Sequence, residues 1–549
     1  MNYILFGIAA LLLLMLFAFF DARKKKKQLL EDLKDNWGKE KTEPVDFDKA
    51  SWYATYVKEN VFHKLSHQTM ADIDFDQLFA KIDRTTSKIG QQFLYNKLTK
   101  PGNNLKELKE LKDQADFFIK NPVIREKVQT ALIKLNSNES YSVVLLFNDK
   151  LVEKPTWFKW LSIDLLILAV LFILSIKISI CLIFALFLIV FNATYLNYWN
   201  KKHLLIFTRS LSQLNILINV SRKLVKEQIP FEADKIKNAI PMFRKFQRRI
   251  GILYQDFSQN NQGDISQLPL YLFEIIKAIF LIEIFTFFKL IKLIENNQND
   301  ILNLYQYVGS VDMAISVASL NQSEEVCTPQ FTQAQKGIEI KAIRHPLIGN
   351  CIENEVKLDQ KSMLITGSNM SGKSTFLRTV AINSLLAQTI YTCFAGSYKA
   401  PFLKLHTSIR IDDNLFQGKS YFLEEVDVMS ALIAATESDG QNLFILDEVF
   451  KGTNTIERIA AAKAILSHLN QEQNLTFVAT HDIELSAMLA ETYELYHFTE
   501  TITDNELIFD HKLKEGPLKT KNAIKILEMS GYPKEIIEEA LKISKDLSA

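Results

Sequence analysis

The sequence predicts an α/β domain with a parallel sheet in the C-terminal part of the chain, an all-α region before it, and apolar helices long enough to cross a membrane. Three observations support this fold class. A glycine-rich loop, GSNMSGKST at residues 367–375, stands between a predicted buried strand and a predicted helix. A second apolar stretch, LFILDE at residues 443–448, ends in two carboxylates. Two long apolar runs, at residues 3–20 and 157–199, have the length of membrane spans.

The composition limits the number of domains and the kinds of partner. With 549 residues the chain is too long for one hydrophobic core, so about two to four domains are expected. Lysine plus arginine (64) nearly balances aspartate plus glutamate (63), so any nucleic-acid-binding surface has to be local. The cysteines have no paired spacing, which argues against a disulfide framework and against a zinc site. They are Cys181, Cys327, Cys351 and Cys393.

The N-terminal run YILFGIAALLLLMLFAFF at residues 3–20 has no charge and is followed at once by Asp21, Arg23 and the lysines at 24–27. A secretory signal has its positive charges before the apolar run and a cleavage site of small residues after it. Here the charges follow the run. We therefore expect residues 1–22 to be an uncleaved transmembrane anchor, with the basic cluster and the chain after it on the cytoplasmic side.

The second apolar region, residues 157–199, is about two bilayer widths long and is interrupted near its middle by Lys177. Lysines flank both ends, and aromatic residues gather where the membrane interface would lie. These residues are Lys154, Lys159, Lys201 and Lys202, and Trp157, Trp160, Tyr195, Tyr198 and Trp199. The pattern predicts a hairpin of two transmembrane helices with both ends in the cytoplasm. The alternative is a buried helical hairpin of a soluble core, which so long an apolar run disfavours.

A third apolar stretch, residues 268–295, is interrupted every few residues by a charge. Several charges within one spanning helix would cost about 2.5 to 3.5 kcal/mol each at the bilayer centre. We therefore expect this stretch to be a long, mostly buried helix outside the membrane.

The surroundings of the glycine-rich loop predict a site for a nucleoside triphosphate. KSMLIT at residues 361–366 has the pattern of a buried strand, and FLRTVAINSLLAQ at residues 376–388 that of a helix with one apolar face. In this setting G-x-x-x-x-G-K-S is a phosphate-binding loop, or P-loop. The predicted nucleotide-binding residues are Gly367, Ser368, Asn369, Met370, Ser371, Gly372, Lys373, Ser374 and Thr375.

Each residue type has a role in such a loop. Gly367 and Gly372 let backbone amides approach the phosphates, and the helix N-terminus faces their negative charge. Lys373 reaches the β- and γ-phosphates, and Ser374 ligates magnesium. ATP and Mg²⁺ are therefore the expected cofactors.

Two later strands supply the rest of the chemistry. LFILDE reads as a central strand whose Asp447 would hold the magnesium shell and whose Glu448 would orient and deprotonate the attacking water. LTFVATH at residues 475–481 reads as another core strand that ends in His481, which would sense the γ-phosphate. The predicted catalytic residues are thus Lys373, Glu448 and His481, and the predicted magnesium ligands are Ser374 and Asp447.

These motifs together resemble those of the MutS family of mismatch-repair ATPases. The stretches that carry the resemblance are GSNMSGKST, DNLFQGKSYFLEEV at 413–426, DEVFKGTNT at 447–455, ATHDIELS at 479–486, RHPLI at 344–348, KTKNAIKILEMSGYPKEIIEEALKI near the C-terminus, and DFDQLFAKIDRTTSKIGQQFLYNKL at 74–98. The helices from about 203 to 320 resemble the family's lever helices.

The resemblance implies a fold, a division into domains and two further site residues. The fold is an α/β P-loop ATPase domain of the ABC and MutS type, preceded by an all-α core and lever domain and combined with transmembrane helices. The implied boundaries are an anchor at 1–22, a core-like region at 23–150, a hairpin at 157–199, a lever-like region at 200–335, an ATPase domain at 336–510 and a helix-turn-helix dimerisation segment at 511–549. Asn369 would be the asparagine of the phosphate loop. Ser420 would be the signature serine that reaches the partner's γ-phosphate in a homodimer.

The sequence also departs from the family's pattern. Phe450 and Lys451 stand where the family has glycine and arginine, and Ser368 replaces a proline. Cys351 occupies a position where an aromatic residue would stack on adenine. The mismatch-reading and connector domains and the DNA-gripping clamp find no counterpart in the chain.

The expected function is that of a membrane-anchored, homodimeric MutS-type ATPase that binds mismatched or structured DNA. The basic stretch FRKFQRR at 243–249 would contact phosphates, or else be a solvated helix face or a contact with anionic lipid. The alternative function is an ATP-driven switch that acts on membrane or protein partners without DNA. An ABC transporter is disfavoured, because the chain has few spans and lacks the LSGGQ type of signature. The expected location is a bacterial-type inner membrane, crossed several times, with the ATPase in the cytoplasm.

Overall fold

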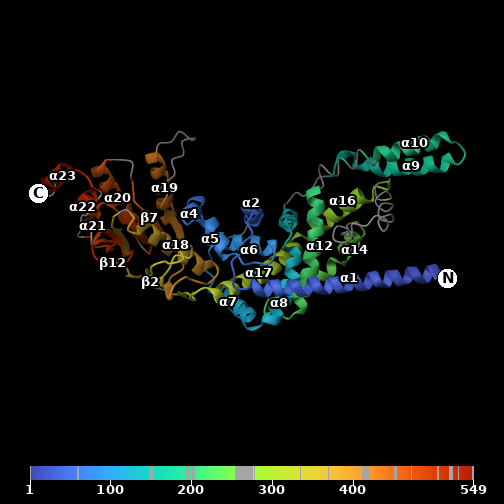
Figure 1. Cartoon of the computed structure of the whole chain (residues 1–549). Helices are drawn as coiled ribbons and strands as arrows, with labels where there is room; N and C mark the ends of the chain where they lie inside the picture. Colours follow the sequence, from blue (N-terminus) through green and yellow to red (C-terminus); the bar gives the residue numbers. More distant parts are fainter. Residues whose placement is uncertain are drawn as a thin grey trace. The chain divides into compact units, whose positions relative to one another are not determined.

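The structure is a computed structural model of the whole chain (Figure 1). It describes all residues except 1, 58–60, 148–153, 193, 195–197, 199–204, 254–275, 277–278, 334–335, 369, 411–420, 451–453, 472, 504–505, 519–522, 530 and 547–549. The chain divides into two compact units. The first unit comprises Met1–Glu59, Asp83–Asn96 and Gln114–Ser319, and the second comprises Asn60–Ile82, Lys97–Asp113 and Leu320–Ala549.

The described secondary structure of the first unit is entirely helical, as predicted. Its helices, with those that lead into it, are α1 (Asn2–Asp35), α2 (Phe47–Ala50), α3 (Trp52–Tyr56), α6 (Lys88–Thr99), α7 (Leu105–Lys120), α8 (Pro122–Leu132), α9 (Leu161–Ser175), α10 (Ile180–Phe191), α12 (Leu205–Lys226), α13 (Asp234–Met242), α14 (Arg244–Leu253), α16 (Ile282–Glu295) and α17 (Gln298–Ser323). Short 3-10 helices lie at Ile133–Leu135, Asn138–Phe147 and Thr156–Trp160.

A buried carboxylate joins α17 to the start of α6. Asp312 is fully buried and accepts hydrogen bonds from the backbone amides of Thr86 and Ser87, at 2.8 and 2.7 Å, and from the Ser87 hydroxyl at 2.6 Å. These donors belong to the helix start, where amides have no partner within the helix. A Cβ at Gly90 would overlap the Asp312 carboxylate, so the close approach of the two helices requires glycine there.

The apolar region at 157–199 forms two helices that pack against each other, α9 and α10, seen side by side in Figure 1. Their ends are joined by Asn192, whose amide donates to Asp164 at 2.6 Å. Many of their apolar side chains are exposed, among them Ile173, Ile183 and Phe187, which are 67%, 66% and 72% exposed. The hairpin does not match the alternative of a buried soluble core.

The expectation of several full-length spans is not met in the part of the chain that the structure describes. There, one helical stretch, Thr156–Ser175, is long and apolar enough to cross a membrane. Helix α10 is apolar but has 12 residues, about 18 Å of helix against a hydrocarbon core of about 30 Å. Residues 193–199, in which its end was predicted, lie mostly outside the described residues.

Helix α1 continues through the predicted anchor and beyond its expected end at residue 22, as far as Asp35. The side chains of residues 1–15 are outside the described part of the chain. The predicted boundary at residue 22 is therefore not a break in the backbone.

The long helix predicted over 268–295 is interrupted at Leu281 in the described residues. Helix α16 begins at Ile282, because Leu281 has a left-handed backbone (φ 51°) that interrupts the helix there. Residues 268–275 lie outside the described residues. The predicted burial is confirmed for α16, where Ile284, Phe287 and Ile291 are at most 2% exposed and Lys289 faces solvent.

The second unit contains the predicted α/β domain. Six of its described strands form a sheet in the order β12 (Lys514–Glu515), β9 (Tyr493–His497), β4 (Ser362–Thr366), β8 (Leu475–Thr480), β7 (Asn442–Asp447) and β6 (Lys404–Ser408). All neighbours are parallel except β12 and β9. The strands predicted over 361–366, 443–448 and 475–481 are thus confirmed as β4, β7 and β8.

The other strands of this unit form two smaller sheets. One has the order β1 (Gln330–Phe331), β5 (Ser397–Ala400), β2 (Gly337–Ile343) and β3 (Asn354–Asp359). The other is the hairpin of β10 (Glu500–Thr503) and β11 (Glu506–Phe509). The helices are α4 (His67–Asp72), α5 (Phe75–Ile82), α18 (Lys373–Thr389), α19 (Tyr421–Thr436), α20 (Thr455–Leu469), α21 (Ile483–Leu489), α22 (Ala523–Met529) and α23 (Lys534–Asp546).

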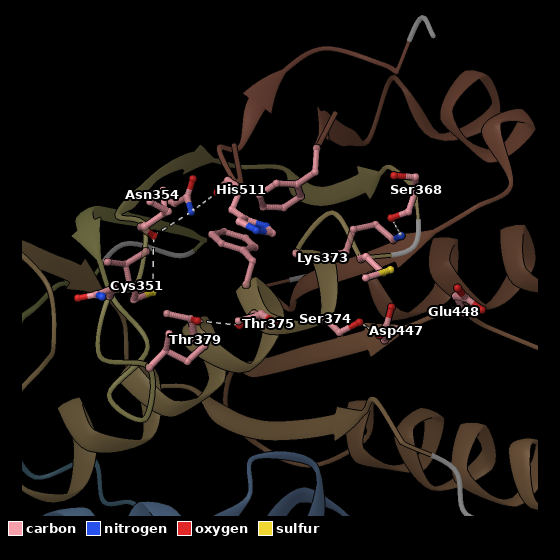
Figure 2. A pocket seen from close by; sticks show the side chains of 18 residues that line it. Cys351, Asn354, Ser368, Lys373, Ser374, Thr375, Thr379, Asp447, Glu448 and His511 are labelled. Atoms are coloured by element: carbon pink, nitrogen blue, oxygen red, sulfur yellow. Dashed lines mark hydrogen bonds between the residues drawn. The ribbon is translucent and has the colours of Figure 1, made fainter. Parts of the chain in front are cut away.

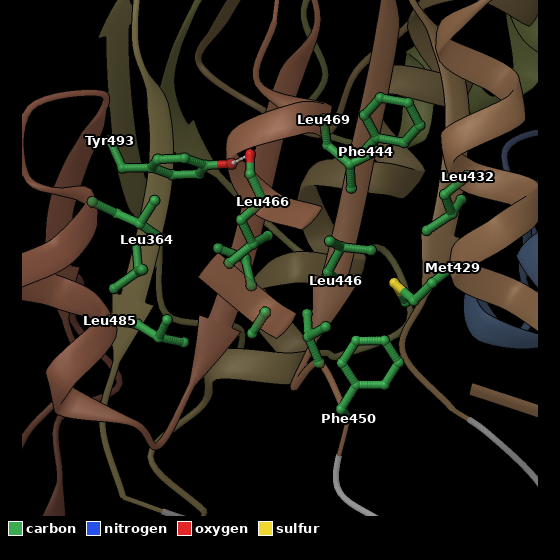
Figure 3. Close-up of a cluster of buried hydrophobic side chains, with 14 residues drawn as sticks. Leu364, Met429, Leu432, Phe444, Leu446, Phe450, Leu466, Leu469, Leu485 and Tyr493 are labelled. Atoms are coloured by element: carbon green, nitrogen blue, oxygen red, sulfur yellow. Dashed lines mark hydrogen bonds between the residues drawn. The ribbon is translucent and has the colours of Figure 1, made fainter. Parts of the chain in front are cut away.

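Helices cover both faces of the parallel sheet. Side chains alternate along a strand, so Phe444 and Leu446 of β7 point to one face, where they join a buried cluster with α19, α20 and α21 (Figure 3). Helix α18 packs against β6, β7 and β8 and contributes nothing to that cluster, so it covers the opposite face. Each buried Leu or Phe of such a core stabilises the fold by about 1.5 to 3 kcal/mol.

Candidate nucleotide-binding site

The functional residues predicted from separate motifs meet at one edge of the parallel sheet. In the strand register Thr366 of β4 lies beside Thr480 of β8, and Asp447 of β7 lies beside Ala479. The chain segments that follow these three strands therefore emerge together at the carboxyl edge, where open α/β sheets bind their ligands.

The glycine-rich loop begins directly after β4 and ends at the start of α18. Gly367 (φ 157°) lies so close to the backbone after β9 that a Cβ at this position would be 2.8 Å from the Phe498 carbonyl oxygen. Gly372 (φ 112°) and Met370 (φ 70°) have left-handed backbones. The loop is therefore a tight turn that brings its backbone toward the N-terminus of α18, an arrangement that favours a bound phosphate.

Lys373 is the first residue of α18 and is 5% exposed. Its Nζ donates hydrogen bonds to the carbonyl oxygens of Gly367 and Ser368, at 2.8 and 2.9 Å. The ammonium group is thus held inside the loop, where a phosphate oxygen would be a third acceptor.

Other side chains hold the loop in shape. Ser371 Oγ donates to the Ser368 carbonyl at 2.8 Å, and Ser368 Oγ donates to Glu500 at 2.6 Å. Ser368, which stands where the family has proline, therefore ties the loop to β10. Asn369 lies outside the described residues, as does Ser420.

Ser374 and Asp447, the predicted magnesium ligands, are in direct contact, because Ser374 Oγ donates to Asp447 Oδ2. Hydroxyl and carboxylate oxygens are the ligands that Mg²⁺ takes from proteins, and Mg²⁺ keeps several waters or phosphate oxygens besides. Among the described residues there is no group of three or more His, Cys, Asp or Glu side chains that would hold a metal. The pair therefore fits Mg²⁺ held together with a phosphate.

Glu448 and His481 form an ion-pair contact, with Nε2 of the imidazole 2.8 Å from Oε1 of the carboxylate. The same Nε2 lies 3.5 Å from Lys373 Nζ. One ring nitrogen cannot donate to the carboxylate and also accept from the ammonium. The shorter contact assigns the proton to Nε2, which donates to Glu448.

The backbone at Glu448 is strained, with φ at 62°, and its amide donates to the Ala479 carbonyl at 2.9 Å. A left-handed backbone is unfavourable for a residue with a Cβ and costs about 1 to 3 kcal/mol. Such strain concentrates at functional sites, where it fixes the direction of a side chain. Here it fixes the carboxylate of Glu448 beside His481.

A cavity of about 420 Å³ lies over the loop (Figure 2). Its polar part is lined by Lys373, Ser374, Asp447 and Glu448, and the rest by Ile343, Ile348, Asn350, Cys351, Ile352, Asn354, Ser368, Met370, Gly372, Thr375, Phe376, Thr379, Phe498 and His511. A charged end and a mixed apolar and polar end suit a ligand with a phosphate chain and a planar base. The segment at 344–348 lies beside the cavity, as its resemblance implied, through Ile348.

His511, Asn354 and Phe498 are among the cavity residues that no sequence motif indicates. His511 lies 3.0 Å from the Ser371 carbonyl through Nδ1, which must therefore carry a proton, and Asn354 donates to the His511 carbonyl at 3.1 Å. The third is Phe498, whose ring packs against Phe376. Cys351 lines the cavity as expected, and its sulfur accepts from the His345 amide at 3.2 Å. Phe498, His511 and Asn354 meet only because β9, β11 and β3 lie together in the fold. A local sequence motif therefore does not mark them.

Buried polar groups connect the site to the rest of its unit. Arg378, on α18, donates to the Asp72 carbonyl at 2.8 Å. The Asp72 carboxylate in turn accepts from the Thr407 hydroxyl and the amides of Ile409 and Arg410, at 2.6, 3.0 and 2.8 Å.

Burial and the nearby Arg378 lower the pKa of His345 to about 4, so this histidine is neutral at physiological pH.

Comparisons with known proteins find similarity to MutS proteins. Residues 363–548 match the family model described as MutS domain V. The chain is 30% identical over 246 residues to the DNA mismatch repair protein MutS of a Thermus thermophilus strain, a match that covers 44% of this chain and 30% of that protein. It is 31% identical over 262 residues to MutS of Lactobacillus delbrueckii subsp. bulgaricus (46% and 30%), and 33% identical over 256 residues to MutS of Lactobacillus acidophilus (44% and 29%).

The matches therefore span less than a third of the length of these relatives. The family model matches the part of the chain that holds most of the α/β domain and the phosphate loop. This part of the chain is thus similar to domain V of MutS.

Proposed function

We propose that the chain is a Mg²⁺-dependent ATPase of the MutS type. The observation that carries this proposal is that Lys373, Ser374, Asp447 and Glu448 line one cavity and that His481 contacts Glu448. These residues come from segments at the ends of three separate strands, β4, β7 and β8. Phosphoryl transfer needs positioned charge more than covalent help, and this constellation supplies it.

Each residue has a definite task in this proposal. Lys373 and the loop amides bind the phosphates, and Ser374 with Asp447 would hold magnesium, which neutralises developing phosphate charge when bound. Glu448 orients a water and accepts its proton. His481 donates to Glu448 and keeps its carboxylate in place.

Two variants test the assignment. Lys373→Ala should lose nucleotide binding, because the buried ammonium is the cation of the loop. Glu448→Gln should bind ATP normally and lose turnover by a factor of about a hundred or more, since the amide cannot accept a proton. Nucleotide binding and phosphate release are measured on the detergent-solubilised full chain. Full turnover in the glutamine variant would remove Glu448 from the mechanism.

We further propose a homodimer in which Ser420 of one chain completes the site of the other, with α22 and α23 at the dimer contact. A cross-linked heterodimer of Lys373→Ala and Ser420→Ala chains distinguishes this arrangement. Completion in trans leaves one intact site and about half of the wild-type turnover. Completion within one chain leaves none. The matched control places both substitutions on one chain beside a wild-type partner. In this control, completion in trans leaves no intact site, whereas completion within one chain leaves one.

DNA is the proposed partner, since the relatives are named as DNA mismatch repair proteins. Helix α14 offers a surface for phosphates, because Arg244 and Arg248 are exposed while Phe243 and Phe246 are buried. Binding of the Glu448→Gln chain to homoduplex, mismatched and branched DNA is measured with and without ATP across a salt series. Preference for one structure would identify the substrate.

The second candidate function is an ATP-driven switch that acts on membrane or protein partners without DNA. The exposed apolar surface of α9 and α10 favours it. Absence of DNA binding at physiological salt, with ATP still bound, would select this function over the first.

Both functions include attachment to an inner membrane, with the hairpin inserted from the cytoplasmic side and the ATPase in the cytoplasm. A membrane-impermeant maleimide tests this topology in intact cells. Lys177→Cys, at the tip of the hairpin, should be labelled from outside. Lys159→Cys, at its base, should be labelled only after permeabilisation. Labelling of both positions only after permeabilisation would contradict insertion of the hairpin.

A further inference from the structure

Two cysteines that lie far apart in the sequence face each other in the second unit. Cys327 and Cys393 form an isolated antiparallel bridge. The Cys327 amide donates to the Cys393 carbonyl at 2.8 Å, and the Cys393 amide donates to the Cys327 carbonyl at 3.0 Å. Both cysteines are free in the structure, although they lie directly opposite each other.

The backbone places the two side chains within reach of a disulfide. Residues that exchange both hydrogen bonds of an antiparallel pair have Cα atoms about 5.5 Å apart. Disulfides join Cα atoms about 4.4 to 6.8 Å apart. Moreover, directly opposed residues of an antiparallel pair have their side chains on the same face, so both thiols project from the same side of the bridge.

The two thiols differ in access and in acidity. Cys327 is partly exposed, whereas Cys393 is fully buried and also donates to the Asn383 carbonyl at 3.5 Å. The neighbouring Cys393 thiol, and more weakly the charge of Arg344, lower the pKa of Cys327. Burial raises the pKa of Cys393 well above its ordinary value. Cys327 is thus the thiol that an oxidant reaches first, because the thiolate is the reactive form.

We propose that Cys327 and Cys393 are a reversible thiol–disulfide pair, oxidised by a small disulfide of the glutathione type. The Cys327 thiolate attacks one sulfur of glutathione disulfide, and the first glutathione leaves as a thiolate. The Cys393 thiol passes its proton to that thiolate or to water and attacks the Cys327 sulfur, and the second glutathione leaves. The protein loses two thiol hydrogens and gains one disulfide, while one glutathione disulfide becomes two glutathione thiols.

The bond would reinforce a junction that hydrogen bonds already make. The Thr392 hydroxyl donates to the Asn321 amide oxygen at 3.0 Å, and Arg344 pairs with Glu325. Residues 321–327 are the end of α17 and the segment that follows it, and Cys393 follows α18, whose first residue is Lys373. Oxidation would fix this segment covalently to the chain just beyond the phosphate-loop helix. In a reducing compartment such a pair responds to oxidant rather than serving as a permanent staple.

The test is disulfide mapping on the folded, detergent-solubilised full chain. The protein is equilibrated in glutathione buffers of increasing disulfide content, quenched with acid, alkylated and digested, and the peptides are identified by mass spectrometry. The expected result is a peptide that links Cys327 to Cys393 and disappears on addition of dithiothreitol. The readout does not involve nucleotide, so its failure is distinguishable from failure of the proposed ATPase.

Variants make the result specific. Cys327→Ser should abolish the linked peptide and leave Cys393 unmodified, because Cys393 is buried. The matched control Cys181→Ser, which removes a thiol remote in sequence, should still form the bond. Cys327 is substituted rather than Cys393, because Cys393 is buried and its substitution could disturb the fold. The Cys327→Ser variant is checked for a circular dichroism spectrum like that of the wild type. The proposal is overturned if excess glutathione disulfide modifies Cys327 without forming the link, or if the link appears only after denaturation.

Discussion

Arg458 and Asp482 form a bidentate ion pair, in which Nε and Nη2 of the guanidinium lie 3.0 and 2.6 Å from the two carboxylate oxygens. Arg458 belongs to α20, and Asp482 directly follows His481. Because the planar fork of arginine fixes both oxygens of its partner, the pair sets the direction of the chain that carries His481. Arg458 is thus a positioning residue for the contact between His481 and Glu448.

Arg458→Ala should lower turnover about tenfold, equivalent to about 1.4 kcal/mol, and leave ATP binding close to that of the wild type. Loosening His481 disturbs Glu448 but not the phosphate loop. Arg458→Lys keeps the charge without the fork and should be intermediate. Turnover and ATP affinity are measured separately, and a parallel loss of both would contradict a positioning role.

Ser374→Ala should raise the Mg²⁺ concentration needed for half-maximal turnover by about tenfold, because one of the two protein oxygens is lost. Ser374→Thr retains the hydroxyl and should stay close to the wild type. Turnover is titrated with Mg²⁺ at fixed ATP. An unchanged Mg²⁺ requirement in the alanine variant would exclude Ser374 as a ligand.

Phe450 has a left-handed backbone (φ 60°) and a buried ring, at the position where the family has glycine. Loss of the ring in Phe450→Ala should destabilise the fold by about 3 to 5 kcal/mol. Phe450→Gly loses the same ring but relieves a left-handed strain of about 1 to 2 kcal/mol. The glycine variant should therefore be the more stable of the two by roughly 1 kcal/mol, after the larger entropy of unfolded glycine is subtracted.

The control for this order is Phe444, which is fully buried in the same cluster but lies within β7. There alanine should be more stable than glycine, as in most strands. Denaturant unfolding measures the four variants. If the alanine variant were more stable than the glycine variant at both positions, the backbone strain at Phe450 would not be significant.

Asp312 makes stability depend on pH. Burial raises the pKa of Asp312 to about 6 from the ordinary 3.8, so the folded chain binds this proton more tightly than the unfolded chain. The contribution of Asp312 to stability is therefore fully present below about pH 4 and is lost as the pH rises through about 6, by on the order of 3 kcal/mol. Asp312→Asn, which cannot ionise, should lack this contribution.

The difference in thermal midpoint between the wild type and Asp312→Asn, measured from about pH 4 to about pH 8, isolates this residue from the other titrating groups. The wild type should gain on the variant as the pH falls. A constant difference across the range would show that Asp312 keeps one protonation state.

The sequence predicted the parts of the site that lie on continuous apolar strands. Strands of a parallel sheet are buried on both faces and have unbroken apolar sequences. The sequence therefore identified β4, β7 and β8, together with the site residues that follow them, including His481. The phosphate loop was identifiable because glycine and lysine at fixed spacing have few other uses.

Features that depend on distant segments were not predictable. His511 and Phe498 reach the cavity through strands with no motif, and the pairing of Cys327 with Cys393 depends on how two loops meet. Residues 60–82 belong to the second unit, where Asp72 accepts hydrogen bonds from Thr407 of β6 and from the amides that follow this strand. No local pattern indicates this contact. The break at Leu281 also escaped, since a left-handed residue has no signature in an apolar run.

The strand order has a consequence for how the protein is made. Strand β4 lies between β8 and β9, which begin at Leu475 and Tyr493, far along the chain from Thr366. During synthesis the phosphate loop therefore leaves the ribosome long before the strands that hold it. Non-local parallel pairing is slow to form, and α18, buried along most of its length, exposes an apolar surface until then. The nascent chain needs protection from aggregation over this interval, and the capacity to bind nucleotide arises only after β9 has been synthesised.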